Sequence, residues 1–162
     1  MDTQYPELQK AIDFVRQTFA DRNQPLDYMP ASVKHLDTLF DNEFKNGKLK
    51  NPDSAFAKYQ GLIITGVSGY IAHVIIKNTR NTQLAINPSD DKWFMSFKVL
   101  SASGNFVQPG LQVVKRMVKG DEMSLYNYVL ACIPYFLQSP TAQNVSPDNV
   151  APARNKPWWK FR

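Results

Sequence analysis

The sequence predicts an α+β domain. It has N-terminal helices, a small antiparallel β-meander at about 82–107, two C-terminal helices and an extended tail. Apolar residues recur every three or four positions before residue 78 and again after residue 109, as they do on one face of a helix. Between these regions, short runs of strand-forming residues alternate with turn residues. Helices and strands are therefore segregated along the chain, which is typical of α+β domains.

The composition is that of a globular protein. Of 162 residues, 43% are hydrophobic and 20% are charged, so the chain is long and apolar enough to form one core. We expect a single domain over 1–137 and a Pro-rich basic and aromatic tail over 138–162. The single cysteine allows no intrachain disulfide, and the N-terminal residues do not resemble a secretory signal. No uninterrupted apolar run approaches 18 residues, so we expect a cytoplasmic protein without a membrane span.

The net charge of +5 is unevenly distributed. The tail holds four basic residues and one acidic residue, so most of the net charge belongs to it. A domain this close to neutral is not typical of a nucleic-acid-binding protein.

The first two helices are predicted from their spacing. Leu8, Ile12, Val15 and Phe19 form one face of a helix from about Pro6 to Ala20, with Pro6 in its first turn. Residues 21–30 then form a loop. A second helix is expected to begin at Ser32 as its N-cap and to stop at Asn46-Gly47. Its apolar face consists of Val33, Leu36, Leu39, Phe40 and Phe44.

The third helix is predicted to be the longest. Asp53 or Ser54 caps it, and it includes the stretch 61–76, GLIITGVSGYIAHVII, which contains no Asp, Glu, Lys or Arg. Gly66 and Gly69 lie within it, where glycine costs up to about 1 kcal/mol relative to alanine. The usual compensation is the close approach of another backbone, so we expect a neighbouring helix to cross there.

The meander and the last two helices follow. Strands are expected at Thr82–Ile86, Lys92–Leu100 and Phe106-Val107. A helix then begins at Pro109 and ends at Gly120. Asp121 or Ser124 caps the last helix, whose inner face carries Leu125, Val129, Cys132 and Phe136, and Pro134 should kink or end it.

Residues from Ser32 to about Phe136 resemble an uncharacterised family of small bacterial α+β domains. The resemblance rests on a helix with Ser32, Leu36 and Asp37, on Gly69-Tyr70-Ile71, on Trp93 at the start of a strand, on Pro109 before Val113-Val114-Lys115, and on Ser124-Leu125. The family usually carries Gly-Glu where this chain has Ala72-His73, so the one charged position within that helix is altered. The resemblance implies a fold and not an activity, because the family has no agreed function.

The sequence shows no established catalytic or metal-binding motif. A Cys/His pair would require Cys132, which lies on an apolar face where a thiol is usually buried. No Gly-x-Ser-x-Gly elbow occurs, and no Lys-Ser/Thr follows the glycine pair at 66 and 69. His35 has Asp37 and Asp41 nearby, but these carboxylates are expected to face solvent. We therefore expect no catalytic residue, cofactor or metal.

Two features remain as candidate partner-binding sites. His73 interrupts an apolar face. It is either a core histidine with one hydrogen bond, or a histidine at the rim of the helix, or part of a small polar site with Tyr70 and a strand residue near Trp93. The tail ends in an aromatic and basic run containing Trp158, Trp159, Lys160 and Phe161. This run either docks on its own domain, binds a protein partner, or contacts nucleic acid or lipid.

These observations favour a non-enzymatic bacterial protein that acts by protein–protein binding. An immunity or antitoxin-like inhibitor and a secretion-system accessory both fit that description. A nucleic-acid-binding protein that uses the tail with Lys115, Arg116 and Lys119 is one alternative. An enzyme with a small site near His73 and Tyr70 is the other.

Overall fold

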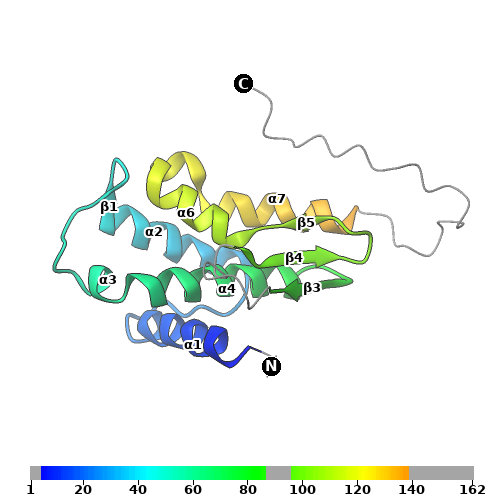
Figure 1. The fold of residues 1–162 in the computed structure, drawn as a ribbon, viewed down its shortest axis with the longest axis horizontal. Coiled ribbons are helices and arrows are strands. Elements are labelled where there is room, and N and C mark those ends of the chain that lie inside the picture. The colour runs from blue at the N-terminus through cyan, green and yellow to red at the C-terminus, as the bar shows by residue number, and fades with distance from the viewer. Residues whose placement is uncertain (1–4, 87–95, 139–162) are drawn as a thin grey trace, which may run out of the picture.

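A computed structural model describes residues 5–86 and 96–138 of the chain (Figure 1). The predicted α+β class is confirmed. The helices are α1 (Pro6–Ala20), α2 (Val33–Glu43), α3 (Ala55–Lys58), α4 (Gln60–Lys77), α6 (Pro109–Lys119) and α7 (Leu125–Leu137), with 3-10 turns η1 (Pro30–Ser32) and η2 (Gly120–Met123). The strands are β1 (Phe44–Lys45), β2 (Lys48–Leu49), β3 (Thr82–Ala85), β4 (Lys98–Ser101) and β5 (Phe106–Val107).

Helix α4 lies at the centre of the fold. Figure 1 shows it between α1 on one side and α2, α6 and α7 on the other, with the β3-β4-β5 sheet near its C-terminal end. Val67, Ile71 and Val74 are fully buried, and one continuous core extends from Leu8 in α1 to Phe136 in α7. Among the described residues, α4 is the one helix with the length and hydropathy of a membrane span, and 61% of it is buried inside the fold.

The predicted helix crossing at the two glycines of α4 is confirmed. A Cβ at Gly66 would overlap the carbonyl oxygen of Ala11 and would lie 2.6 Å from Cγ2 of Val15. A Cβ at Gly69 would lie 2.6 Å from Cδ1 of Leu8. These contacts are all with α1, so the glycines let the two backbones approach more closely than any larger residue would allow.

The predictions for α2 are only partly correct. The helix ends at Glu43, and Phe44 begins a two-strand hairpin instead of extending the helical face. Asn46 and Gly47, at φ 51° and 74°, form the hairpin turn and are not a helix C-cap. Positive φ at two consecutive residues is what a tight two-residue hairpin turn requires.

The predicted third helix is divided in two. Ser54 caps α3 by accepting a hydrogen bond from Ala57 N at 3.1 Å, and Tyr59 leaves helical geometry before α4 begins. The meander has the order β3-β4-β5, all antiparallel. Of the expected strand 92–100, residues 92–95 lie outside the described ranges, Ser96 and Phe97 are described but are not in a strand, and β4 begins at Lys98.

The last two helices begin where the prediction places them, and α6 also ends there. The apolar face that the spacing of Leu111 and Val118 predicts for α6 is wrong, since both are exposed while Val113 and Arg116 are buried. Gly120, at φ 70°, ends α6, and Ser124 caps α7 by accepting from Asn127 N at 3.2 Å. Pro134 lies inside α7, which continues to Leu137, so the proline does not end the helix. Leu125, Val129 and Phe136 of the predicted inner face are buried.

Candidate functional site

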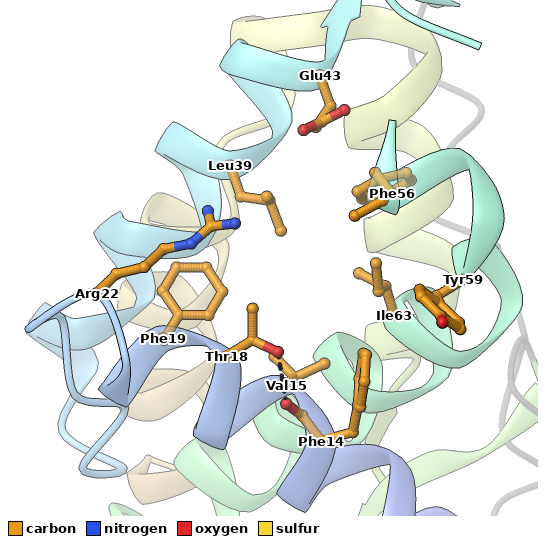
Figure 2. Close-up of a pocket in the computed structure, with 11 residues that line it drawn as sticks. Phe14, Val15, Thr18, Phe19, Arg22, Leu39, Glu43, Phe56, Tyr59 and Ile63 are labelled. Carbon is orange, nitrogen blue, oxygen red and sulfur yellow. Dashed lines mark hydrogen bonds between the residues drawn. The ribbon is translucent and has the colours of Figure 1, made fainter. Parts of the chain in front are cut away.

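A small pocket opens between α1, α2 and the start of α4 (Figure 2). Its volume is about 70 Å³. It is lined by Phe14, Val15, Thr18, Phe19, Arg22, Leu39, Glu43, Ala55, Phe56, Tyr59 and Ile63. Val15, Phe19 and Phe56 are buried, whereas the other lining residues are half-buried or exposed. Ala55 and Phe56 come from α3, so the pocket lies where α1, α2, α3 and α4 meet.

The wall of the pocket is apolar and aromatic. Phe14 and Tyr59 face each other with ring centroids 5.7 Å apart and ring planes at 56°. Thr18 donates its hydroxyl to the Phe14 carbonyl at 2.8 Å, as Figure 2 shows, so this polar group is already satisfied within α1. The pocket therefore presents carbon surface from two aromatic rings, with little polar surface between them.

Two charged side chains of opposite sign complete the lining. Arg22 follows α1 and is exposed, and Glu43 is the last residue of α2 and is half-buried. Neither belongs to the ion pairs that the described residues form with one another. No cysteine or histidine lines the pocket.

The size of the pocket limits what it can hold. Sites for drug-sized ligands and cofactors usually measure about 300–1,000 Å³. At about 70 Å³ the pocket is several times smaller than that. It is closer to the size of a single apolar side chain than to that of a cofactor.

Tyr70 lies in the core and not on a binding surface, which corrects the prediction that it contacts a partner. Its side chain is fully buried. The Ser32 hydroxyl donates to the Met29 carbonyl, so the Tyr70 hydroxyl donates to Ser32 Oγ at 2.6 Å and accepts from Tyr28 N at 2.9 Å. Burial raises the pKa of the Tyr70 phenol, while the Ser32 and Tyr28 hydrogen bonds oppose that rise. Ser32 therefore joins the loop to α4 and does not cap α2 with its side chain.

His73 lies at the edge of the buried face of α4. It is half-buried, and its Nδ1 lies 2.9 Å from the Gly69 carbonyl oxygen one turn earlier in α4. The ring of Tyr28 stacks on Tyr70 at 5.0 Å and lies 6.2 Å from the His73 ring. Tyr28 also carries Lys77 Nζ over its face at 3.7 Å. His73 thus borders an aromatic and cationic cluster that holds the 21–30 loop on α4.

Arg116 is buried in an ion-pair network, which corrects its interpretation as an exposed basic contact. Only 2% of its side chain is exposed. Its Nε donates to Asp37 Oδ1 at 2.9 Å, and its Nη2 donates to both the Asp37 carbonyl and Asp41 Oδ1. Lys115, its neighbour on α6, is half-buried.

Asp37 is the centre of that network, so the expectation of a merely solvated carboxylate is wrong for this residue. Besides Arg116, it accepts from the Ser124 hydroxyl at 2.8 Å and from the backbone N–H groups of Leu125 and Tyr126 at 2.9 and 3.0 Å. It therefore satisfies two free donors at the N-terminus of α7, where negative charge is favourable.

Cys132 is a buried thiol, as predicted. Burial raises its pKa to about 11, so the thiol is protonated and poorly nucleophilic near neutral pH. The nearby Tyr128 phenol is also affected, since burial raises its pKa well above the usual value. Within the described ranges, no three His, Cys, Asp or Glu side chains gather in a metal-binding group.

Sequence reasoning missed the pocket and its aromatic wall. Phe14 lies two positions after Ile12 and therefore outside the predicted apolar face of α1. A large aromatic residue outside that face was the one sequence signal that could have indicated the pocket. Tyr59 was assigned to a continuous helical face, but 41% of it is exposed at the break between α3 and α4. The predicted contacts Trp93, Trp158, Trp159, Lys160 and Phe161 lie outside the described residues.

We compared the chain with protein-family models, with curated proteins and with solved structures, and none of them matches.

Proposed function

We propose that this chain acts by binding another protein and that the pocket between α1, α2 and α4 receives one apolar side chain of that partner. The observation that carries the proposal is an open apolar pocket of about 70 Å³ with an aromatic wall. In protein interfaces, most of the binding energy comes from a few anchor side chains that fill such pockets. Inhibition of a toxin and attachment to a secretion system are both activities of this kind.

The charges beside the pocket specify the partner further. Arg22 and Glu43 have opposite signs and lie on the same pocket lining. A segment that places an aliphatic or aromatic residue between an acidic and a basic residue would match both. Such charges contribute mainly to specificity and association rate, while the buried anchor contributes most of the affinity.

The alternative functions have less support. Arg116 is occupied by Asp37 and Asp41, so the basic cluster on α6 loses its central cation for phosphate binding. Tyr70 is buried and its hydroxyl is hydrogen-bonded to Ser32 and Tyr28, which gives an enzyme near His73 no free phenol.

A peptide-display selection against the folded chain tests the proposal. We expect the enriched peptides to share one large apolar residue and to lose at least about tenfold in affinity for Thr18→Trp, because an indole at that position covers the Phe14 wall. Thr38→Trp is the matched control, since Thr38 is an exposed helical threonine with the same hydrogen bond to the carbonyl four residues earlier. Equal binding to both variants, or no enrichment at all, would overturn the proposal.

A further inference from the structure

Helix α7 is apolar on its outer face as well as on its inner face. It contains no charged residue, and Val129, Cys132 and Phe136 fill the core side. Its exposed side carries Leu130 and Leu137, which are 43% and 55% exposed, together with Ala131 and Pro134. A surface helix normally has charged or polar residues on its outer face, and a helix that is apolar all round is normally covered.

The structure places this outer face at the periphery of the fold. Figure 1 shows α7 next to α6, at the side of the molecule opposite α1. Its main contacts with the rest of the fold are with α2, α4, α6 and η1. Nothing among the described residues covers the stripe from Leu130 to Leu137.

We propose that the segment Lys156–Arg162 of this same chain binds along the outer face of α7. Trp158, Trp159 and Phe161 would supply the apolar surface that the helix lacks. Each large aromatic side chain buries roughly 150–250 Å² when it is covered, which makes these three residues a matched apolar counterpart. The proposal is independent of the pocket, which α1, α2 and the start of α4 form elsewhere.

Chain length favours this occupant. Residues 139–155 connect α7 to the proposed binding segment. A random coil of that length has a root-mean-square span of roughly 20–25 Å, which reaches any point along α7, about 20 Å long at 1.5 Å per residue. The segment can therefore start at the C-terminal end of α7 and run back along it, and its effective concentration there is in the millimolar range.

Charge favours the same occupant and an antiparallel direction. Asp121 and Glu122 are exposed immediately before α7. A segment that runs back along the helix would bring Lys160 and Arg162 toward these carboxylates. A second copy of the fold packed antiparallel through α7 would bring only the uncharged end of its own α7 to this position. The tail therefore satisfies both the apolar face and the acidic residues beside it.

A paramagnetic label on the full-length chain tests the proposal. Asn155→Cys supplies a reactive thiol next to the segment, and the raised pKa and burial of Cys132 keep the native thiol from competing. We expect loss of the amide signals of Leu130, Ala131 and Leu137, with no loss at Thr18 or Ile63 of the pocket. The loss should persist when labelled protein is diluted into unlabelled protein.

Two pairs of variants separate this contact from its alternatives. Leu130→Glu should restore the α7 signals, whereas Leu62→Glu, at a comparably exposed leucine on α4, should leave them broadened. The paired change Lys160→Glu and Arg162→Glu alters no described residue and should also restore the α7 amide signals. Added salt should weaken the contact and restore them in part. Unchanged α7 signals, or signal loss that disappears on dilution and so reports a second copy, would overturn the proposal.

Discussion

The substitution Gly66→Ala is a direct test of the crossing between α1 and α4. Helix propensity alone predicts that alanine stabilises the middle of α4 by roughly 0.5–1 kcal/mol. The structure predicts the opposite sign. The new Cβ would overlap the Ala11 carbonyl oxygen and lie 2.8 Å from the Ala11 carbonyl carbon, and these backbone atoms cannot move without shifting α1.

The magnitude follows from the cost of overpacking. Forcing an extra methyl group into a packed core costs about 1–3 kcal/mol and sometimes more. After the propensity gain is subtracted, we expect Gly66→Ala to lower the free energy of unfolding by about 1–2 kcal/mol. For a chain of this size, that corresponds to a decrease in Tm of roughly 2–8 °C.

Two other glycines of the same helix serve as matched controls. Gly61 has no atom within 4 Å of its virtual Cβ, so Gly61→Ala should be neutral or slightly stabilising. Gly69 would meet the side-chain ends of Leu8 and Ile12, which can move, so Gly69→Ala should fall between the other two. Urea unfolding of the three variants gives the order directly. A Gly66→Ala protein as stable as the Gly61→Ala protein would refute the proposed close approach of the two backbones.

Three further predictions follow from the buried polar groups. Asp37→Asn should lower the free energy of unfolding in urea by about 2–4 kcal/mol, because Arg116 loses its most buried counter-ion. Asp41→Asn, at a carboxylate that is 57% exposed, should lower it by under about 1 kcal/mol. Equal losses for the two variants would argue against the network. The Cys132 thiol holds its proton more tightly in the folded protein, so its contribution to stability is complete below pH about 9 and is lost as pH rises toward about 11. Stability measured across that window should fall less steeply for Cys132→Ala than for the parent chain, and identical slopes would contradict the pKa shift. Tyr70→Phe should lower the free energy of unfolding by about 1–3 kcal/mol and speed hydrogen exchange at the Tyr28 amide, because that partly buried N–H loses its acceptor. Tyr59→Phe, at an exposed phenol, should change neither the free energy of unfolding nor the exchange rate.

Several residues that the sequence pattern singled out have structural roles in this chain. Ser32 and Tyr70 are hydrogen-bonded to each other, Asp37 and Ser124 are hydrogen-bonded to each other, and Gly69 lies at the α1 crossing. The pocket, in contrast, depends on Phe14 and Tyr59, which are not among those positions.

Predictions from the sequence were wrong where one local pattern is compatible with two different structures. Asn46-Gly47 suits a helix end and a hairpin turn equally well, and the pairing of Phe44 with Leu49 decides for the hairpin. Asp37 and Asp41 have the spacing of a solvated helical face. Arg116, 79 residues after Asp37 in the sequence, turns the first of them into a buried ion-pair partner.

The sequence by itself determined the extents of α1 and α6 and the end of α6 at Gly120, and it narrowed the caps of α3 and α7 to two residues each, of which Ser54 and Ser124 are the caps. These features depend on residues within a few positions of one another, so periodicity and backbone preferences are sufficient to predict them. Only the tertiary structure decided the Asp37–Arg116 network, the pocket and the uncovered face of α7. Each of these arises where segments distant in sequence are brought together, and no local pattern specifies which surfaces those segments cover and which they leave open.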